Sequence, residues 1–240
     1  MRVAVLSDIH ANLPALEAVL AAVAPFDAVW HLGDTVGYGP QPNEVVERLT
    51  REGAIGVRGN HDSAATGLID ADWFNEDARV AIELTARVLT PASKAALLAL
   101  PERRTEGAFT LVHGSPRDPI WEYIASTAVA RAGLDDLTTP YGLFGHTHDP
   151  RVFRAQGGTV ETSGPSDRAE LQLDERPVLL NPGSVGQPRD GDPRASVLVL
   201  DVEARRATWH RVAYDIPEVQ ARMREVGLPK RLIDRLDRGL

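Results

Sequence analysis

The chain has 240 residues, of which 43% are hydrophobic, so it is long enough to bury a sizeable core. It contains no cysteine, which excludes disulfide bonds, thiolate metal ligands and a cysteine nucleophile. The formal net charge of −8 argues against a general nucleic-acid or anionic-membrane binder, and no apolar run reaches the roughly 20 residues of a membrane span.

The first elements follow a strand–helix–strand pattern. Residues 3–6 are a continuous apolar run, which predicts a buried strand. Asn12 is placed to cap a helix in which four apolar residues recur at helical spacing, namely Leu13, Leu16, Leu20 and Val23. A second apolar run covers residues 28–32, so we expect two parallel strands joined by a right-handed crossover.

The middle of the chain continues this alternation. Strands are predicted over residues 55–57, 109–112 and 141–144, and helices over 44–51 and 126–134. Residues 72–100 are typical of two helices broken near Thr90-Pro91.

The last third is richer in strand signals. Glycine-rich turns at Gly157-Gly158 and at residues 163–166 separate short β-prone runs, which indicates a hairpin within residues 150–181. Further strands are predicted over 178–180, 196–200 and 207–212, followed by polar helices over 217–226 and 229–238. Because no repeat or linker is visible, we expect one α/β domain over residues 1–240 with two sheets.

Polar motifs follow strand-like runs at five places: Asp8-Ile9-His10, Gly33-Asp34, Gly59-Asn60-His61-Asp62, His113-Gly114 and Gly145-His146-Thr147-His148. Each motif alone is compatible with a surface turn or a core histidine. Open α/β sheets place their sites at the carboxyl ends of strands, so we expect the five motifs to meet there.

The motifs supply two carboxylates, four imidazoles and one amide as metal ligands: Asp8, His10, Asp34, Asn60, His113, His146 and His148. Seven groups are too many for one tetrahedral zinc ion, and they suit two divalent ions that share a carboxylate. Oxygen and nitrogen ligands without sulfur favour manganese as the cofactor, with iron, nickel, cobalt or zinc as alternatives.

The motif order DxH, GD, GNHD, GH and GHTH resembles the calcineurin-like metallophosphoesterase family. The residues around the motifs resemble its YfcE-like bacterial and archaeal phosphodiesterases, and Asn181-Pro182-Gly183-Ser184 resembles the family's C-terminal part. The resemblance implies a four-layer αββα sandwich, in which helices flank two mixed β-sheets.

The resemblance also implies a role for each motif residue. Asp8, His10 and His148 would hold one metal ion, Asn60, His113 and His146 the other, and Asp34 would bridge them. His61 would act near the leaving group, with Asp62 orienting it.

These assignments predict hydrolysis of a phosphodiester or a phosphomonoester. Metal binding can lower the pKa of water from about 15.7 towards 7, so a bridging hydroxide would attack the phosphorus. His61 would protonate the departing alkoxide, a contribution of typically 10²–10⁴-fold.

Two arginines in Pro/Gly-rich loops, Arg117 and Arg189, are candidates for substrate binding because a guanidinium can donate two hydrogen bonds to a phosphate. The alternative is a loop salt bridge to the adjacent Asp118 or Asp190. The remaining singled-out residues are interpreted as structural: His31 and His210 in strands, Asn43 as a helix cap, and Trp73, Phe74, Trp121 and Tyr123 in the core.

Alternative functions are a diadenosine-polyphosphate hydrolase, a protein phosphatase, or a non-catalytic protein-interaction scaffold. The expected partner is a small phosphorylated substrate, and residues 64–106 could cap the site or form a homo-oligomer face. Asp8 interrupts the first apolar run, so the N-terminus does not resemble a signal peptide, and we expect a cytoplasmic protein.

Overall fold

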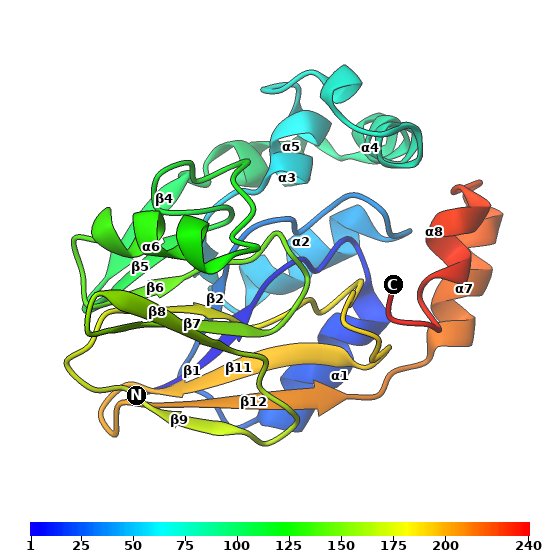
Figure 1. Ribbon diagram of the computed structural model, residues 1–240. Helices are drawn as coiled ribbons and strands as arrows, with labels where there is room; N and C mark the ends of the chain where they lie inside the picture. The colour runs from blue at the N-terminus through cyan, green and yellow to red at the C-terminus, as the bar shows by residue number, and fades with distance from the viewer.

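The computed structural model describes residues 1–240 and builds them into two six-stranded sheets (Figure 1). In the first sheet the strand order is β3 (Ile55–Gly56), β2 (Ala28–His31), β1 (Arg2–Leu6), β11 (Ala195–Asp201), β12 (Arg206–Val212) and β9 (Glu170–Gln172). In the second sheet it is β4 (Arg103–Glu106), β5 (Phe109–Val112), β6 (Tyr141–Leu143), β10 (Val178–Asn181), β7 (Arg151–Gln156) and β8 (Thr159–Ser163).

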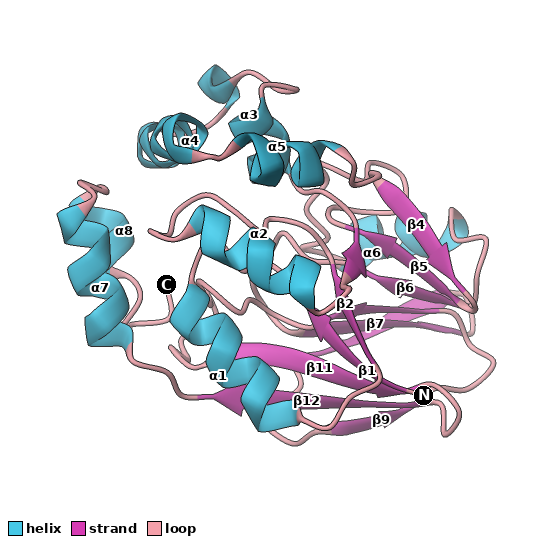
Figure 2. Cartoon of the chain, turned by 180° about the vertical axis from the view of Figure 1, so that it is seen from behind, coloured by secondary structure: helices cyan, strands magenta, loops and turns pink.

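Helices cover the outer faces of both sheets. Helices α1 (Leu13–Val23) and α2 (Pro42–Arg51) lie against the first sheet, and α6 (Thr127–Asp135) lies against the second (Figure 2). The order helix, sheet, sheet, helix is the predicted four-layer αββα sandwich, and the prediction is confirmed.

The alternation of side chains along β1 explains the layers. Val3 and Val5 point between the sheets, where they join a cluster that includes Trp30, Phe109 and other buried residues of both sheets. Their neighbours in the strand belong to the cluster under α1 and α2. Both faces of β1 are therefore buried, which is why its sequence is a continuous apolar run.

Both sheets are mixed. Strands β1, β2 and β3 are parallel, as predicted for the first two, and β11 runs antiparallel to β1. Strands β5, β6 and β10 are parallel, and β7 is antiparallel to β10. The adjacent pair β11–β12 and the hairpin β7–β8 are also confirmed.

The remaining helices lie towards one end of the sandwich. They are α3 (Asn60–Thr66), a 3-10 turn (Ala71–Trp73), α4 (Glu76–Val88), α5 (Pro91–Leu98), α7 (Ile216–Glu225) and α8 (Lys230–Asp234). The predicted break near Thr90-Pro91 separates α4 from α5. Helix α3 was expected only as a turn, and α8 is shorter than predicted.

The predicted cap role of Asn43 is wrong. Helix α2 begins at Pro42, after Gln41, so Asn43 already lies inside its first turn. The Asn43 amide instead donates to the carbonyl of Val88 at 2.9 Å and accepts from the backbone of Thr90 at 2.9 Å. Asn43 therefore ties α2 to the turn between α4 and α5.

Candidate metal centre

The seven predicted ligands converge at the carboxyl ends of strands from both sheets. Asp8 and His10 follow β1, Asp34 follows β2, Asn60 follows β3, His113 follows β5, and His146 and His148 follow β6. Each of the seven is no more than 3% exposed. Six of them form two triads with metal-binding spacing, Asp8–His10–His148 and Asp34–His113–His146.

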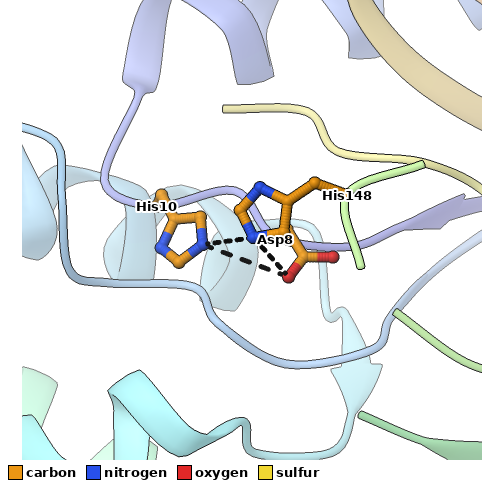
Figure 3. Close-up of side chains that lie close together, drawn as sticks. All are labelled: Asp8, His10 and His148. Carbon is orange, nitrogen blue, oxygen red and sulfur yellow. Dashed lines mark hydrogen bonds and ion pairs between the residues drawn. The ribbon is translucent and has the colours of Figure 1, made fainter. Parts of the chain in front are cut away.

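The three side chains of the first triad point toward one another (Figure 3). His148 Nε2 lies 3.2 Å from His10 Nε2 and 3.2 Å from Asp8 Oδ1. The other Asp8 oxygen accepts hydrogen bonds from the Ser7 hydroxyl at 2.6 Å and from the backbone N–H of His146 at 3.1 Å. Oδ1 has no hydrogen-bond partner and faces the imidazoles.

The predicted amide ligand, Asn60, lies beside the second triad. His113 Nε2 lies 3.1 Å from Asn60 Oδ1 and 3.0 Å from His146 Nδ1. Asp34 Oδ1 accepts the backbone N–H of His61 at 2.9 Å, which turns Asp34 Oδ2 towards both triads. That oxygen lies 3.6 Å from His10 Nε2 and 3.4 Å from His113 Nε2.

The hydrogen-bond partners of the imidazoles indicate that these groups fit cations. Nδ1 of His10, His113 and His148 contacts the backbone carbonyl of Val36, Leu32 and Gln187, at 3.1, 2.8 and 2.6 Å respectively. A carbonyl only accepts, so each ring carries its proton on Nδ1 and a neutral ring presents a lone pair at Nε2. His10 and His148 thus direct lone pairs at each other beside an unpaired carboxylate oxygen, an arrangement that a divalent cation would stabilise.

The pKa values of the ligand candidates also indicate a site that suits cations. Burial lowers the pKa of His10 and His148 well below the usual value, so both rings are neutral at pH 7. Burial also acts to lower the pKa of His113, but the Asp34 carboxylate outweighs it and raises that pKa to about 9. Burial raises the pKa of Asp8 to about 7, because a charged carboxylate is poorly solvated there. The site favours additional positive charge.

The backbone is strained at the ligands. Asp8, His10, Asp34, His146 and His148 all have left-handed conformations with φ between 47° and 66°. Such conformations cost of order 1–3 kcal/mol each in non-glycine residues and cluster at functional sites. Gly59 permits a close approach, because a Cβ there would lie 2.0 Å from Asp34 Oδ1.

His61 lies against the first triad, but Asp62 does not orient it. The His61 ring packs 4.9 Å from His10, 4.3 Å from Tyr38 and 5.1 Å from Phe74, measured between ring centroids. The Asp62 carboxylate instead accepts hydrogen bonds from the backbone of Gly59 and Val36 and from the Thr35 hydroxyl. The predicted contact between Asp62 and His61 is therefore wrong, and aromatic packing holds the ring.

The two candidate arginines, Arg117 and Arg189, have different surroundings and different hydrogen-bond partners. Arg117 is exposed and forms an ion pair with Glu122, not with the adjacent Asp118. Arg189 lies over the Tyr38 ring at 5.7 Å and donates to Gln187 Oε1 at 2.8 Å, while Asp190 pairs with Arg211.

Two of the aromatic residues assigned to the core are exposed. Trp73 is 71% exposed and Tyr123 is 50% exposed. The Tyr123 ring stacks on His146 at 3.7 Å, so it covers a metal-ligand candidate. The sequence reasoning missed this because an aromatic residue in a loop carries no signal of which side chain it will meet.

The fold and the site can now be compared with known protein families. The model of the calcineurin-like phosphoesterase superfamily domain matches residues 1–205, and the chain belongs to that superfamily. The chain is therefore a metal-dependent phosphoric ester hydrolase by family, and its two His/Asp triads are where metal ions could bind.

Two curated relatives are similar to this chain over different lengths. The chain is 37% identical to the uncharacterized protein MJ0912 of Methanocaldococcus jannaschii over 99% of this chain and 98% of that protein. A 75-residue match, 41% identical, to phosphodiesterase YfcE of Escherichia coli K12 covers 26% of this chain and 41% of that protein, and it supports the predicted YfcE-like group.

Among solved structures, a metallophosphoesterase from Sphaerobacter thermophilus superposes with a TM-score of 0.93 at 45% identity, covering 100% of this chain and 99% of that one. The hypothetical protein PH1004 from Pyrococcus horikoshii OT3 shares the fold, with a TM-score of 0.79 at 22% identity over 100% of this chain and 98% of that one.

Proposed function

We propose that the chain is a binuclear metallohydrolase that cleaves a small phosphodiester or phosphomonoester. The observation that carries the proposal is the position of Asp34, whose Oδ2 lies within 3.6 Å of a histidine of each triad. A single carboxylate oxygen that faces two ligand sets is suited to bridging two cations. Manganese is the proposed metal, because the ligands are oxygen and nitrogen without sulfur.

Each residue then has a task. Asp8, His10 and His148 would hold one ion, and Asn60, His113 and His146 the other. When bound, the ions supply a water of lowered pKa and positive charge for the phosphoryl oxygens. His61, packed against His10, would donate a proton to the leaving oxygen.

None of the helices combines the length and the hydropathy that a membrane span needs. A cytoplasmic location stays a prediction.

The decisive experiment combines metal analysis with turnover. Protein purified without chelator, then loaded in turn with manganese, nickel, iron or zinc, should bind two ions per chain and hydrolyse bis-p-nitrophenyl phosphate. Asp34→Asn should lower both the metal content and the rate. A protein that holds two ions yet turns over neither mono- nor diesters would instead favour the scaffold alternative.

A further inference from the structure

A cavity of about 560 Å³ lies next to the metal centre. Its lining includes Tyr38 and Tyr123, which contact metal-ligand candidates, and three arginines, Arg189, Arg231 and Arg235. Arg231 belongs to α8 and Arg235 directly follows it. Figures 1 and 2 show α4 and α8 on the same side of the molecule, and Leu232 and Ile233 of α8 belong to the same apolar cluster as Ala78 and Ala81 of α4.

The cavity is close enough to the ligands to hold part of the same substrate. The Tyr38 ring lies 4.6 Å from the His10 ring, and Arg189 Cζ lies 5.7 Å from the Tyr38 ring. The Arg189 guanidinium is therefore within about 10 Å of a metal-ligand candidate. Tyr123, on the same cavity wall, stacks on His146.

The guanidinium groups of Arg189 and Arg235 share one uncharged partner. Gln187 Oε1 accepts from Arg189 Nη2 at 2.8 Å and from Arg235 Nη1 at 3.2 Å. The amide is uncharged, and no Asp or Glu carboxylate lies within 4 Å of the guanidinium of Arg189, Arg231 or Arg235, in contrast to the paired Arg211. Arg235 Nε also donates to a terminal oxygen of Leu240, so only Arg189 and Arg231 lack an anionic partner, and Arg189 Nε is buried without any partner.

The same glutamine connects the arginines to the metal centre. The backbone carbonyl of Gln187 contacts His148 Nδ1 at 2.6 Å, and the backbone N–H of Arg189 donates to the carbonyl of His148 at 3.2 Å. One short segment thus orients a metal-ligand candidate and two guanidinium groups together.

Such a grouping of like charges favours an anion. Burial and the nearby Arg189 lower the pKa of Arg235 to about 10, as expected where positive charges are crowded. Two acids, Glu76 and Asp77, line the cavity as well. They occupy the first turn of α4, where the helix dipole stabilises carboxylates.

We propose that Arg189, Arg231 and Arg235 bind a second phosphate group of the substrate, which stays intact while the ester at the metal centre is hydrolysed. This substrate class, a phosphate ester with another phosphate within about 10 Å of the first, rests on the proposed function. Arginine suits the task because its planar guanidinium matches two phosphate oxygens.

The test uses two esters that differ only in the second phosphate. They are the p-nitrophenyl ester of thymidine 5′-phosphate and the same ester carrying a 3′-phosphate, and both release p-nitrophenolate. The manganese-loaded protein should show a kcat/KM at least roughly tenfold higher for the 3′-phosphorylated ester, since charge-assisted hydrogen bonds are the strong ones. Arg231→Gln should shrink this ratio, and Arg231→Gln with Arg235→Gln should bring it close to one.

The control is Arg224→Gln, which removes the same charge from an exposed arginine of the neighbouring α7, outside the cavity lining. This variant should keep the wild-type ratio of kcat/KM between the two esters. Equal kcat/KM for the two esters in the wild type, or an unchanged ratio in the double variant, overturns the subsite and leaves the proposed function intact.

Calorimetric binding separates the two proposals. If the metal-loaded protein hydrolyses neither ester, the proposed function fails, and the subsite is judged by binding alone. Tighter binding of thymidine 3′,5′-bisphosphate than of thymidine 5′-monophosphate, lost in the double variant, supports the subsite. Equal binding of the two nucleotides overturns it.

Discussion

The His61 ring packs on the metal-ligand candidate His10, but His61 is not a candidate ligand itself. Its role in catalysis can therefore be tested separately from metal binding. Its backbone N–H holds Asp34, and its ring packs on His10, so His61→Ala removes the ring and leaves the carboxylate in place. We expect unchanged metal content and a rate loss of about 10²–10⁴ on alkyl phosphate esters, whose leaving groups need a proton. The loss on p-nitrophenyl esters should be much smaller. Equal losses on both kinds of ester would show that His61 is not the general acid.

Burial of His31 makes the free energy of unfolding depend on pH. It is 3% exposed, its Nδ1 has no partner, and burial lowers its pKa to about 4. Because the folded-state pKa is below the unfolded value of about 6.5, His31 contributes stability that is fully present above pH 6.5. That stability, roughly 3 kcal/mol, is lost as pH falls from 6.5 to 4.

Urea unfolding at pH 7.5 and at pH 5, with chelator present, measures this effect in the wild type and in His31→Phe. The variant should lose less of its unfolding free energy between the two pH values than the wild type does. Identical pH dependence in both proteins would mean that His31 is protonated in the folded state as easily as in the unfolded chain.

At the scale of elements, Asp62 holds the helix that begins with the metal-ligand candidate Asn60. Its carboxylate accepts three hydrogen bonds, from Gly59, Val36 and Thr35, and so joins the start of α3 to the loop after β2. Asp62→Ala leaves three buried donors unpaired, and we expect a loss of about 3 kcal/mol of unfolding free energy. The variant should also bind less metal, because α3 begins at Asn60.

Denaturant unfolding and metal analysis measure both effects. The matched control is Asp70→Ala, which removes an exposed carboxylate that caps only the 3-10 turn, and it should cost no more than about 1 kcal/mol. If Asp62→Ala were as stable as Asp70→Ala, the carboxylate would not be what fixes α3.

The same helix shows what sequence patterns could and could not predict. Strand β1 was predictable because burial on both faces makes residues 3–6 a continuous apolar run. Helix α3 was not, since all seven of its residues are buried and none is a large apolar residue, so it lacks an amphipathic pattern. Strand β9 pairs with β12 in the first sheet, a choice made by packing and not by local sequence.

For the site as well, sequence patterns could predict some residues and not others. The ligand candidates could be predicted because each stands within a few residues of a strand end, where local order fixes its position. Arg231 and Arg235 could not, since they reach the cavity only because a distant C-terminal helix docks beside α4. Gln187 was missed for a related reason, as its links to His148 and to the arginines depend on one loop's final shape.

For the whole molecule, the candidate metal centre lies where the two sheets meet. Asp8 and Asp34 follow strands of the first sheet, while His113 and His146 follow strands of the second. A cation held by both sets links the sheets in the folded state only, so binding must stabilise the fold. Free manganese at 100 times its dissociation constant should add about 2.7 kcal/mol for each ion bound. For a chain of this length, that corresponds to a rise in Tm of roughly 5–10 °C.

Differential scanning calorimetry of chelator-treated protein, with and without added manganese, measures the shift, and excess chelator should reverse it. Asp34→Asn is the informative variant, because it keeps the side-chain shape but removes the charge that faces both triads. Its shift should be clearly smaller than that of the wild type at the same free manganese concentration. A wild-type Tm that manganese leaves unchanged would mean that the imidazoles and carboxylates pack stably without a cation, and that the two triads are not a metal centre.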